Sequence, residues 1–347
     1  MQKVITHINF AKGFRGGERQ TQLLIEQLSK KGFTQKLLVR KGSTLAKKVA
    51  NTQNLEIIEL SKPYILHLNA VNNSSILHAH ETKALQFAYF ASFLKKIPYI
   101  VTRRVDNKIK NNWLNKLLYQ NAKYCVVLSS AIEKTILDIT TQVNTVTIPS
   151  AFINTPINQE KTKQIKARFP NKFLIGHIGA LDDKHKGQSL IIEIAKEIET
   201  KYKDIHFLLI GDGADKQKLQ NMAQNLSNIT FEGFVNNVPD YIAALDLFVF
   251  PSRNEGLGST LLDVMNLNVA IVASNVGGIV DIIEHEKNGL LFDIENKKEF
   301  LEYILELYKN KEKREKLAKN GTKKVQNYSV ENMTQSYIAL YEKVIAL

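Results

Sequence analysis

The 347-residue chain is poor in several residues that define secreted or membrane-spanning proteins. It has one cysteine, Cys125, one tryptophan and only 7 prolines. A single cysteine excludes a disulfide framework and a cysteine-based zinc site within the chain, so we expect a reducing, cytoplasmic location. No apolar run approaches the roughly 20 residues that cross a bilayer, and the N-terminal MQKVITHINF has the pattern of a short strand, unlike a signal peptide.

Three catalytic signatures are also missing. The sequence contains no GxxxxGK[ST], no GxSxG and no HExxH. These absences argue against a P-loop NTPase, a hydrolase with a nucleophile elbow and a zinc protease. What remains has the composition of a folded globular protein, with 44% hydrophobic and 23% charged residues. The length is enough for two domains of ordinary size, each with its own core.

Charge is divided unevenly along the chain. Residues 1–170 contain 26 Lys and Arg against 9 Asp and Glu, whereas residues 171–347 contain 21 against 25. A half this basic is expected to attract an anionic partner, such as nucleic acid, an anionic membrane surface or a charged substrate. The general abundance of lysine explains part of the basicity, but it does not explain the asymmetry.

Short β-branched runs alternate with longer helical patterns from one end of the chain to the other. We expect strands near residues 4–9, 35–39, 75–79, 99–102, 124–128, 144–148, 173–179, 206–210, 229–231, 245–250 and 270–273. The helices expected between them include residues 18–31, 83–94, 112–121, 187–201, 216–225 and 260–266. This alternation predicts an α/β protein with two parallel sheets wrapped by helices.

A polar, proline-containing stretch at residues 149–171 interrupts the alternation. It predicts a basic N-terminal Rossmann-like domain over residues 1–165 and a second Rossmann-like domain over 166–327. The helical segment 328–347 is expected to pack back across the hinge. Because ligands of open α/β sheets bind beyond the carboxyl ends of the strands, we expect the two domains to face each other across a ligand-binding cleft.

The stretch FPSRNEGLGSTLLDVM at residues 250–265 combines the end of an apolar strand, an acidic glycine-containing turn and the start of a helix. A helix N-terminus exposes unpaired N–H groups and a partial positive charge, which favours a phosphate. Glycines let a ligand approach the backbone closely. Glu255, in the turn, is suited to accept hydrogen bonds from hydroxyls. Phosphate and hydroxyls bound by one loop describe a nucleotide sugar better than a free nucleotide.

Two loops in the basic half are further candidates. FAKGFRGGERQ follows the first expected strand, and its Gly16 and Gly17 open a helix; a plain strand-to-helix turn is the alternative. HAHE ends another strand, where alternation puts His78 and His80 on one face. A metal pair would lack further ligands near in sequence. We therefore expect a buried, hydrogen-bonded His78 and a His80 that faces the cleft.

Two loops in the second half also lie between a strand and a helix. In HIGALDDKHKGQ, Lys186 precedes Gly187 at a helix start, where a lysine can meet a diphosphate as a point charge; a solvated loop lysine is the alternative. GDGADK, which contains Gly213, has only part of a GxGxxG pattern and is by itself weak evidence for a dinucleotide.

The order of these motifs resembles that of the retaining glycosyltransferases of family 4, which have the GT-B fold. The match covers nearly the whole chain and is strongest over residues 236–292, where P-S-x-x-E-G-x-G, G-G-I and N-G-L-L follow one another. The resemblance implies that Glu255 contacts hydroxyls of the transferred sugar, that Lys186 binds the diphosphate and that His80 lines the acceptor side. It implies donor contacts at Gly16, Gly17, Gly213, Gly256, Leu257, Gly258, Ser259, Thr260 and Asp263, and a nucleobase contact at Phe234 and Val235.

The chain departs from the family pattern at two places. Asp263 stands where a second glutamate, the ribose partner, is usual, so the ribose must lie closer or a water must bridge the gap. Ala180 follows Gly179 where the family usually has an arginine, which removes one positive charge from the diphosphate site. Lys184 or Arg15 is expected to replace that charge. Further possible contacts to the diphosphate or the acceptor are Arg103 and Arg104.

These features predict a hexosyltransferase that moves a sugar from a nucleotide diphosphate sugar, with UDP favoured, to a hydroxyl of a cell-envelope glycolipid or glycan such as lipopolysaccharide core. Retention at the anomeric carbon is implied by the resemblance. We expect no metal or other cofactor, because Lys186 and the helix N-terminus at Ser259 and Thr260 can stabilise the leaving diphosphate. The basic half predicts peripheral attachment to the inner face of the cytoplasmic membrane. Specific nucleic acid binding is not expected.

Two alternatives of other classes remain open. A nucleotide-sugar epimerase with the same fold would use the same donor site, since fold does not dictate function. A nucleic-acid-binding protein without enzymatic activity is suggested by charge alone, and the sequence has no RRM signature or zinc finger to support it.

Overall fold

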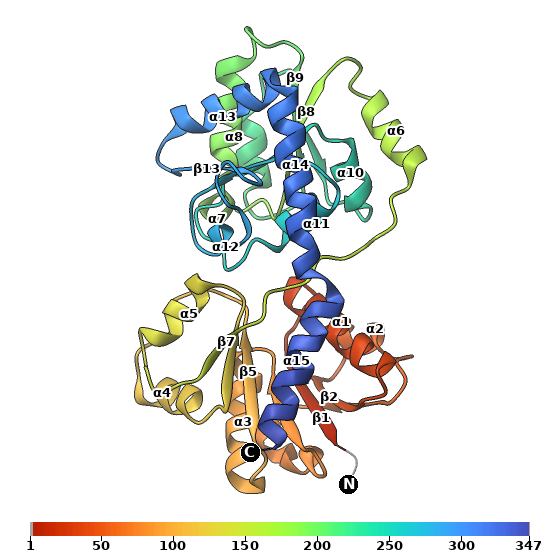
Figure 1. Cartoon of the computed structure of the whole chain (residues 1–347), viewed down its shortest axis with the longest axis vertical. Helices are drawn as coiled ribbons and strands as arrows, with labels where there is room; N and C mark the ends of the chain where they lie inside the picture. The colour runs from red at the N-terminus through yellow and green to blue at the C-terminus, as the bar shows by residue number, and fades with distance from the viewer. Residues whose placement is uncertain (1–2, 347) are drawn as a thin grey trace. The chain divides into compact units, whose positions relative to one another are not determined.

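The computed structural model describes residues 3–346, which form two compact units (Figure 1). Of these residues, those up to Ala151 and those from Tyr328 onward form unit 1, and Phe152–Asn327 form unit 2. Each unit is a parallel sheet covered by helices, so the prediction of two Rossmann-like units is confirmed. Within residues 3–346, the helices are all too short or too polar to cross a membrane.

Unit 1 contains a seven-stranded sheet in the order β3-β2-β1-β4-β5-β6-β7. Its strands are β1 (Val4–Asn9), β2 (Thr34–Arg40), β3 (Leu55–Leu60), β4 (Ile76–Ala79), β5 (Tyr99–Arg103), β6 (Tyr124–Val127) and β7 (Thr145–Thr147). Its helices are α1 (Gly16–Lys30), α2 (Thr44–Lys48), the 3₁₀ helix η1 (Tyr64–Val71), α3 (Thr82–Lys95), α4 (Trp113–Gln120), α5 (Ser130–Leu137) and α15 (Val330–Ile345). The strand order reverses between β1 and β4, where open α/β sheets bind ligands.

Unit 2 contains a six-stranded sheet in the order β10-β9-β8-β11-β12-β13. Its strands are β8 (Phe173–Ile178), β9 (Ile205–Ile210), β10 (Ile229–Gly233), β11 (Leu247–Phe250), β12 (Ile271–Ser274) and β13 (Leu290–Phe292). Its helices are α6 (Gln159–Ala167), α7 (Asp183–Lys186), α8 (Gln188–Ile198), α9 (Lys216–Met222), α10 (Val238–Ala244), α11 (Ser259–Asn266), α12 (Ile279–Ile282), α13 (Lys297–Lys309) and α14 (Lys311–Val325), followed by η2 (Gln326–Tyr328). Its order reverses between β8 and β11.

Apolar runs fill both cores. In unit 1, residues of neighbouring central strands such as Ile5, Ile76 and Ile100 are buried together with Tyr337 and Tyr341 of α15. In unit 2, all six residues of β9 are buried, which fits a parallel strand covered on both faces. Two strands were not predicted from the sequence. β3 is an edge strand with two exposed glutamates, Glu56 and Glu59, and β13 has only three residues.

The division between the units lies at Ala151/Phe152, ahead of the boundary expected at residue 165. The stretch expected to be a linker contains α6, which packs on α10 of unit 2. The backbone N–H of Asn158 donates to Asp240 Oδ1 at 2.7 Å and anchors the start of α6. After η2 the chain returns to unit 1, where α15 packs on α1 and β4.

Candidate functional site

The reversal of strand order in unit 2 brings together the loops that follow β8 and β11. The loop after β11 ends at Gly258, which has a φ of +81° and directly precedes α11. A side chain is strained in this left-handed conformation, so glycine is favoured there. α11 begins at Ser259, one residue before the start expected at Thr260, with Gly258 as its N-cap, and the backbone N–H groups of Ser259 and Thr260 belong to the unpaired helix start.

Lys186 and Glu255, predicted as diphosphate and sugar ligands, form an ion pair with Nζ and Oε2 2.6 Å apart. Both are largely buried, with 23% and 16% of their side chains exposed. Lys186 Nζ also lies 5.4 Å from the centre of the Phe250 ring. A cation and a carboxylate are thus fixed against each other beside the N-terminus of α11.

Two backbone contacts hold the Lys186 loop against the Glu255 loop. The N–H of Arg253 donates to the carbonyl of His185 at 2.8 Å. Gly187, with a φ of +66°, approaches Pro251 so closely that a Cβ would lie 2.2 Å from its carbonyl oxygen. The position of the ion pair is therefore determined by backbone packing as well as by the charges.

Gly277 and Gly278, of the G-G-I motif, support the same loop from the other side. The N–H of Gly278 donates to the carbonyl of Glu255 at 2.8 Å. A Cβ on Gly277 would lie 2.2 Å from the Glu255 carbonyl oxygen, and a Cβ on Gly278 would lie 2.2 Å from that of Gly256. The sequence motif thus has a packing role that orients the acidic loop.

Replacing Gly277 by alanine should lower the free energy of unfolding of unit 2 by about 3 kcal/mol or more, because a backbone clash adds to an unfavourable positive φ. The matched control is Gly233→Ala, which has a φ of +72° and open space around its Cβ position. The control should cost only about 1 kcal/mol. Urea denaturation monitored by circular dichroism measures both, and equal losses would show that the contact with Glu255 contributes nothing.

Beside this loop, unit 2 has an open groove of about 280 Å³ at the carboxyl ends of β8 and β9. Its lining includes Phe234 and Val235, the predicted nucleobase segment, together with the backbone of Gly179 and Gly211. Phe234 is 75% exposed, which is unusual for a phenylalanine and leaves its ring available for stacking on a flat ligand.

The other predicted residues of unit 2 have different surroundings. Asp263 is half-buried, and its Oδ1 accepts a hydrogen bond from the N–H of Ile153 at 3.2 Å, so the carboxylate also anchors the start of unit 2. Gly213 packs on Leu181, with a Cβ position 2.4 Å from the carbonyl oxygen, which explains the glycine without a ligand. Lys184 is exposed on α7, two residues before Lys186, and Leu257 is buried.

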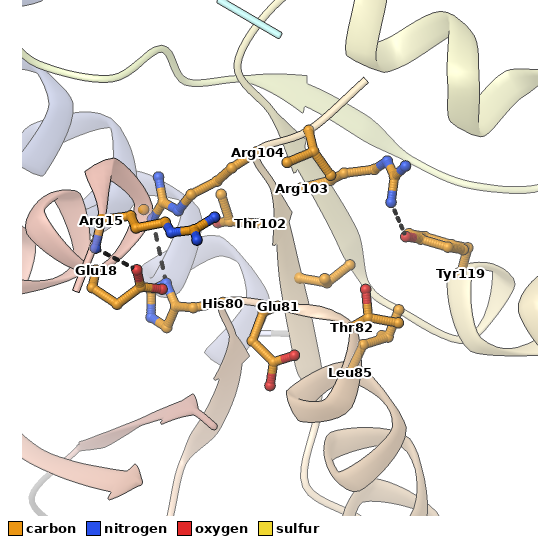
Figure 2. A pocket seen from close by; sticks show the side chains of 13 residues that line it. Arg15, Glu18, His80, Glu81, Thr82, Leu85, Thr102, Arg103, Arg104 and Tyr119 are labelled. Atoms are coloured by element: carbon orange, nitrogen blue, oxygen red, sulfur yellow. Dashed lines mark hydrogen bonds between the residues drawn. The ribbon is translucent and has the colours of Figure 1, made fainter. Parts of the chain in front are cut away.

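Unit 1 has a pocket of about 270 Å³ at its own reversal of strand order (Figure 2). It is lined by Arg15, Gly17 and Glu18 from the start of α1, by His80, Glu81, Thr82 and Leu85 from the end of β4 and the start of α3, and by Val101–Val105 and Tyr119. Gly16 begins α1 with open space around its Cβ position. The predicted loops FAKGFRGGERQ and HAHE therefore do meet in one pocket.

His80 is one end of a buried chain of hydrogen bonds. Its Nδ1 lies 3.4 Å from Arg104 Nη2, and its Nε2 lies 3.0 Å from His7 Nδ1. His7 Nε2 lies 3.1 Å from Gln35 Oε1, and the amide of Gln35 donates to the carbonyl of Ile25 at 3.0 Å. Arginine can only donate and Gln35 Oε1 can only accept, so protons fit on Nε2 of both rings. His80 then presents an unprotonated Nδ1 on the side of Arg104.

All three histidines of this cluster favour the neutral form. Burial holds the pKa of His7 at about 4. Burial, and then repulsion of a protonated ring by the neighbouring histidines and Arg104, lowers the pKa of His78 and of His80 well below the ordinary value of 6.5. A neutral His80 has one acceptor nitrogen, Nδ1, which faces Arg104; a hydroxyl that takes the place of Arg104 can donate to it, which a protonated ring does not allow.

The sequence missed His7 because it lies on a different strand from HAHE; β1 and β4 pair with His7 opposite His78. Ring nitrogens of His7, His78 and His80 lie within 4.8 Å of one another, a spacing that would suit a metal ion. However, His78 contacts the hydroxyls of Tyr341 and Thr102, both at 2.7 Å, and the other two rings are partnered as described above. With the cation Arg104 beside them, these contacts favour a hydrogen-bonded network over a metal site.

The three candidate arginines of unit 1 differ in their partners (Figure 2). Arg103 points away from His80 and donates to Tyr119 Oη at 3.2 Å, to Thr135 Oγ1 at 3.3 Å and to the carbonyl of Asn107. Its guanidinium is therefore engaged by the protein itself. Arg104 and Arg15 lie near His80, and Arg15 is exposed at the start of α1. These two are the better candidates for contact with an anionic ligand.

Comparison with solved structures gives the class to which this fold belongs. The Anabaena protein HepE, in a crystal structure with UDP, superposes with a TM-score of 0.86 at 17% identity, covering 99% of this chain and 100% of that one. The apo lipopolysaccharide outer core galactosyltransferase WaaB superposes with a TM-score of 0.75 at 13% identity, covering 99% and 100%. At these identities the likeness shows the fold alone, and it confirms the predicted GT-B architecture.

Sequence comparison relates unit 2 to a known family. Residues 158–324, which lie within unit 2, match the sequence profile described as "Glycosyl transferases group 1". An uncharacterized glycosyltransferase of Methanocaldococcus jannaschii is 32% identical over 163 residues, covering 46% of this chain and 45% of the relative. The chain spans about half the length of the curated relatives it matches. These matches support the prediction of a glycosyltransferase-type enzyme.

Proposed function

We propose that the chain transfers a hexose-like sugar from a nucleotide diphosphate sugar, with UDP favoured, to a hydroxyl of a cell-envelope glycolipid or glycan such as lipopolysaccharide core. The observation that carries this proposal is the Lys186–Glu255 ion pair beside the glycine-initiated helix α11. The crystal structure of HepE with UDP and the name of WaaB support the choice of donor and of acceptor.

In this proposal unit 2 binds the donor. Phe234 stacks on the nucleobase, Lys186 and the N–H groups of Ser259 and Thr260 neutralise the diphosphate, and Glu255 accepts hydrogen bonds from the sugar hydroxyls. Negative charge grows on the diphosphate as the glycosidic bond to the sugar breaks. Preorganised hydrogen-bond donors at that position stabilise the transition state. Lys186 and the N–H groups of Ser259 and Thr260 thereby supply the electrostatic stabilisation that a metal supplies in other enzymes.

Unit 1 binds the acceptor in this proposal. Arg104 and Arg15 bind anionic groups of the ligand, and as Arg104 turns from His80 to do so, Nδ1 of the neutral His80 accepts a hydrogen bond from an acceptor hydroxyl or a sugar hydroxyl. We further propose retention of configuration by front-face displacement, as in family 4. Such a reaction requires no carboxylate nucleophile. Among the described residues, Glu255 is the one carboxylate within hydrogen-bonding distance of Lys186 Nζ.

A thermal-shift screen against UDP, GDP, ADP and CDP and their common sugars tests the donor site. A ligand at about 100 times its Kd should add roughly 2.7 kcal/mol of stability. We expect UDP to stabilise the wild type and Glu255→Gln alike, and a UDP-sugar to add a further increment only in the wild type. If none of the nucleotides stabilises the protein, the proposed donor site is refuted.

Product analysis tests the reaction type. With the matching sugar nucleotide and a hydroxylated acceptor, we expect free UDP and a glycoside whose anomeric configuration, measured by NMR coupling constants, equals that of the donor. An altered sugar nucleotide without a glycoside would establish an epimerase instead. An inverted glycoside would refute retention while leaving transfer intact.

We also propose that the protein works in the cytoplasm at the inner face of the cytoplasmic membrane. The basic charge of the N-terminal half and a lipid-linked acceptor both favour this location.

A further inference from the structure

Unit 1 exposes five large apolar side chains on two neighbouring elements. Ile65 and Leu66 of η1 are 42% and 75% exposed, and Phe90, Phe93 and Leu94 of α3 are 42%, 73% and 61% exposed. We call these five residues the apolar patch. Phe90, Phe93 and Leu94 are three and four positions apart and so share one helix face, while the other face of α3 is buried through residues such as Leu85 and Ala88.

The two elements form one continuous surface. A groove of about 470 Å³ is lined by Ile65 and the preceding Lys62 on one side and by Lys83, Gln86 and Phe90 of α3 on the other. At the far end of α3, Lys95 Nζ donates to Asn69 Oδ1 of η1 at 3.0 Å. Single exposed apolar residues are ordinary on protein surfaces, but five of them on two adjoining elements mark an interaction surface.

Positive charge surrounds the apolar patch. Lys62, Lys83, Lys95 and Lys96 are all exposed, and we call them the lysine rim. Glu81 is the only acidic residue between positions 61 and 98. Its carboxylate accepts hydrogen bonds from the backbone N–H groups of Phe10, Lys83 and Ala84, so it is engaged at the start of α3.

We propose that the apolar patch and the lysine rim dock the protein on an anionic lipid bilayer. Aromatic and aliphatic side chains enter the boundary between headgroups and acyl chains, and lysine stems extend along it so that the ammonium groups meet lipid phosphates. A bilayer fits better than a protein partner because all the rim charges have one sign, and an anionic lipid surface complements such a rim wherever the protein lands on it. The inference rests on the proposed function, for which it supplies the surface that brings the enzyme to a lipid-linked acceptor.

Sedimentation of the full-length protein with vesicles tests this surface. We expect binding to phosphatidylcholine vesicles that contain phosphatidylglycerol, weaker binding to pure phosphatidylcholine and a decrease with salt. Phe93→Ser with Leu94→Ser should weaken binding to the anionic vesicles at least roughly ten-fold, because two apolar side chains no longer leave water. Lys95→Gln with Lys96→Gln should weaken it roughly five-fold per lysine at low salt.

Control variants outside the apolar patch and the lysine rim test whether vesicle binding depends on this surface. Met222→Ser removes an apolar side chain that is 41% exposed on α9, and Lys316→Gln with Lys319→Gln removes the same net charge from exposed positions of α14. Both should bind vesicles like the wild type. Equal loss in these controls would overturn the assignment of the surface, as would unaltered binding of the Phe93 and Leu94 variant.

Two further measurements distinguish membrane docking from dimerisation through the apolar patch, and distinguish a failure of the docking surface from a failure of the proposed function. Sedimentation equilibrium should show a monomer whose mass is unchanged by the Phe93 and Leu94 substitutions. A dimer lost on substitution would overturn lipid docking in favour of a second copy of the chain. UDP stabilisation without vesicle binding would refute the docking surface alone, whereas vesicle binding without any nucleotide or transfer activity would refute the proposed function alone.

Discussion

Lys186→Met should lower kcat for sugar transfer by about 10²- to 10³-fold, the loss typical of removing one preorganised group that stabilises charge in a transition state. The ammonium group is largely buried and held at 2.6 Å from Glu255, so water replaces it poorly. Initial rates with saturating donor and acceptor measure the effect. The exposed Lys184 on the same short helix provides the comparison, and Lys184→Met should lower kcat by less than about five-fold.

The ion pair adds a second expectation about Lys186. In Lys186→Met, the carboxylate of Glu255 loses its partner and repels the diphosphate. The double variant Lys186→Met, Glu255→Gln should therefore bind UDP more tightly than the single variant, by about five-fold for a repulsion of ~1 kcal/mol. Isothermal titration with UDP, which lacks the sugar, measures this coupling. A single Lys186→Met variant that keeps wild-type activity would remove the lysine from the mechanism.

Acidification from pH 7 towards pH 4 should destabilise both units strongly. Burial lowers the pKa of His7 in unit 1 and of His177 in unit 2 from 6.5 to about 4. His177 is buried beneath the Lys186 loop, with Nδ1 3.1 Å from the carbonyl of Val249 and Nε2 3.3 Å from the amide of Gln188. In the unfolded chain these rings gain a proton near pH 6.5, whereas in the folded protein they stay neutral until about pH 4.

The sign of this linkage follows from the depressed pKa of each ring. Because the unfolded state binds more protons in this window, the stabilisation is complete above about pH 6.5 and decreases as the pH falls to about 4. A difference of about 2.5 pKa units corresponds to a loss of about 3 kcal/mol for each of the two rings at pH 4. His78 and His80, whose pKa values are also lowered, add to the loss in unit 1.

Urea denaturation at several pH values between 7.5 and 4.5 measures this loss. His7→Asn should have a lower free energy of unfolding at pH 7.5 and a shallower pH dependence of unit 1, because one proton-linked group is gone. A profile that is flat between pH 6.5 and 4.5 would contradict neutral burial of these histidines. A paired carboxyl such as Glu284, whose pKa is held at about 2 by Lys324 and Lys287, lowers the free energy of unfolding only below about pH 5, where the unfolded carboxyl begins to gain a proton, so the change between pH 6.5 and 5 reports the histidines.

The sequence determined the features that short, continuous segments encode. Alternation of β-branched runs with amphipathic stretches predicted two parallel sheets, and the turn before Ser259 was correctly expected to start a helix. The left-handed backbone conformation before α11 favours glycine at position 258, so the sequence itself indicates that turn. Composition and charge also reflect the chain alone, and they separated the basic half from the acidic half without any knowledge of the fold.

Only the tertiary structure decided which of these residues meet. Lys186 and Glu255 are 69 positions apart, and His7 and His80 are 73 apart, so no local period indicates their contact. The order and register of parallel strands bring such residues to one edge of a sheet, and these depend on the packing of the whole unit. For the same reason the apolar patch was invisible in the sequence: Phe90, Phe93 and Leu94 have the pattern of a buried helix face, and only the packing of α3 on its sheet shows that this face stays outside.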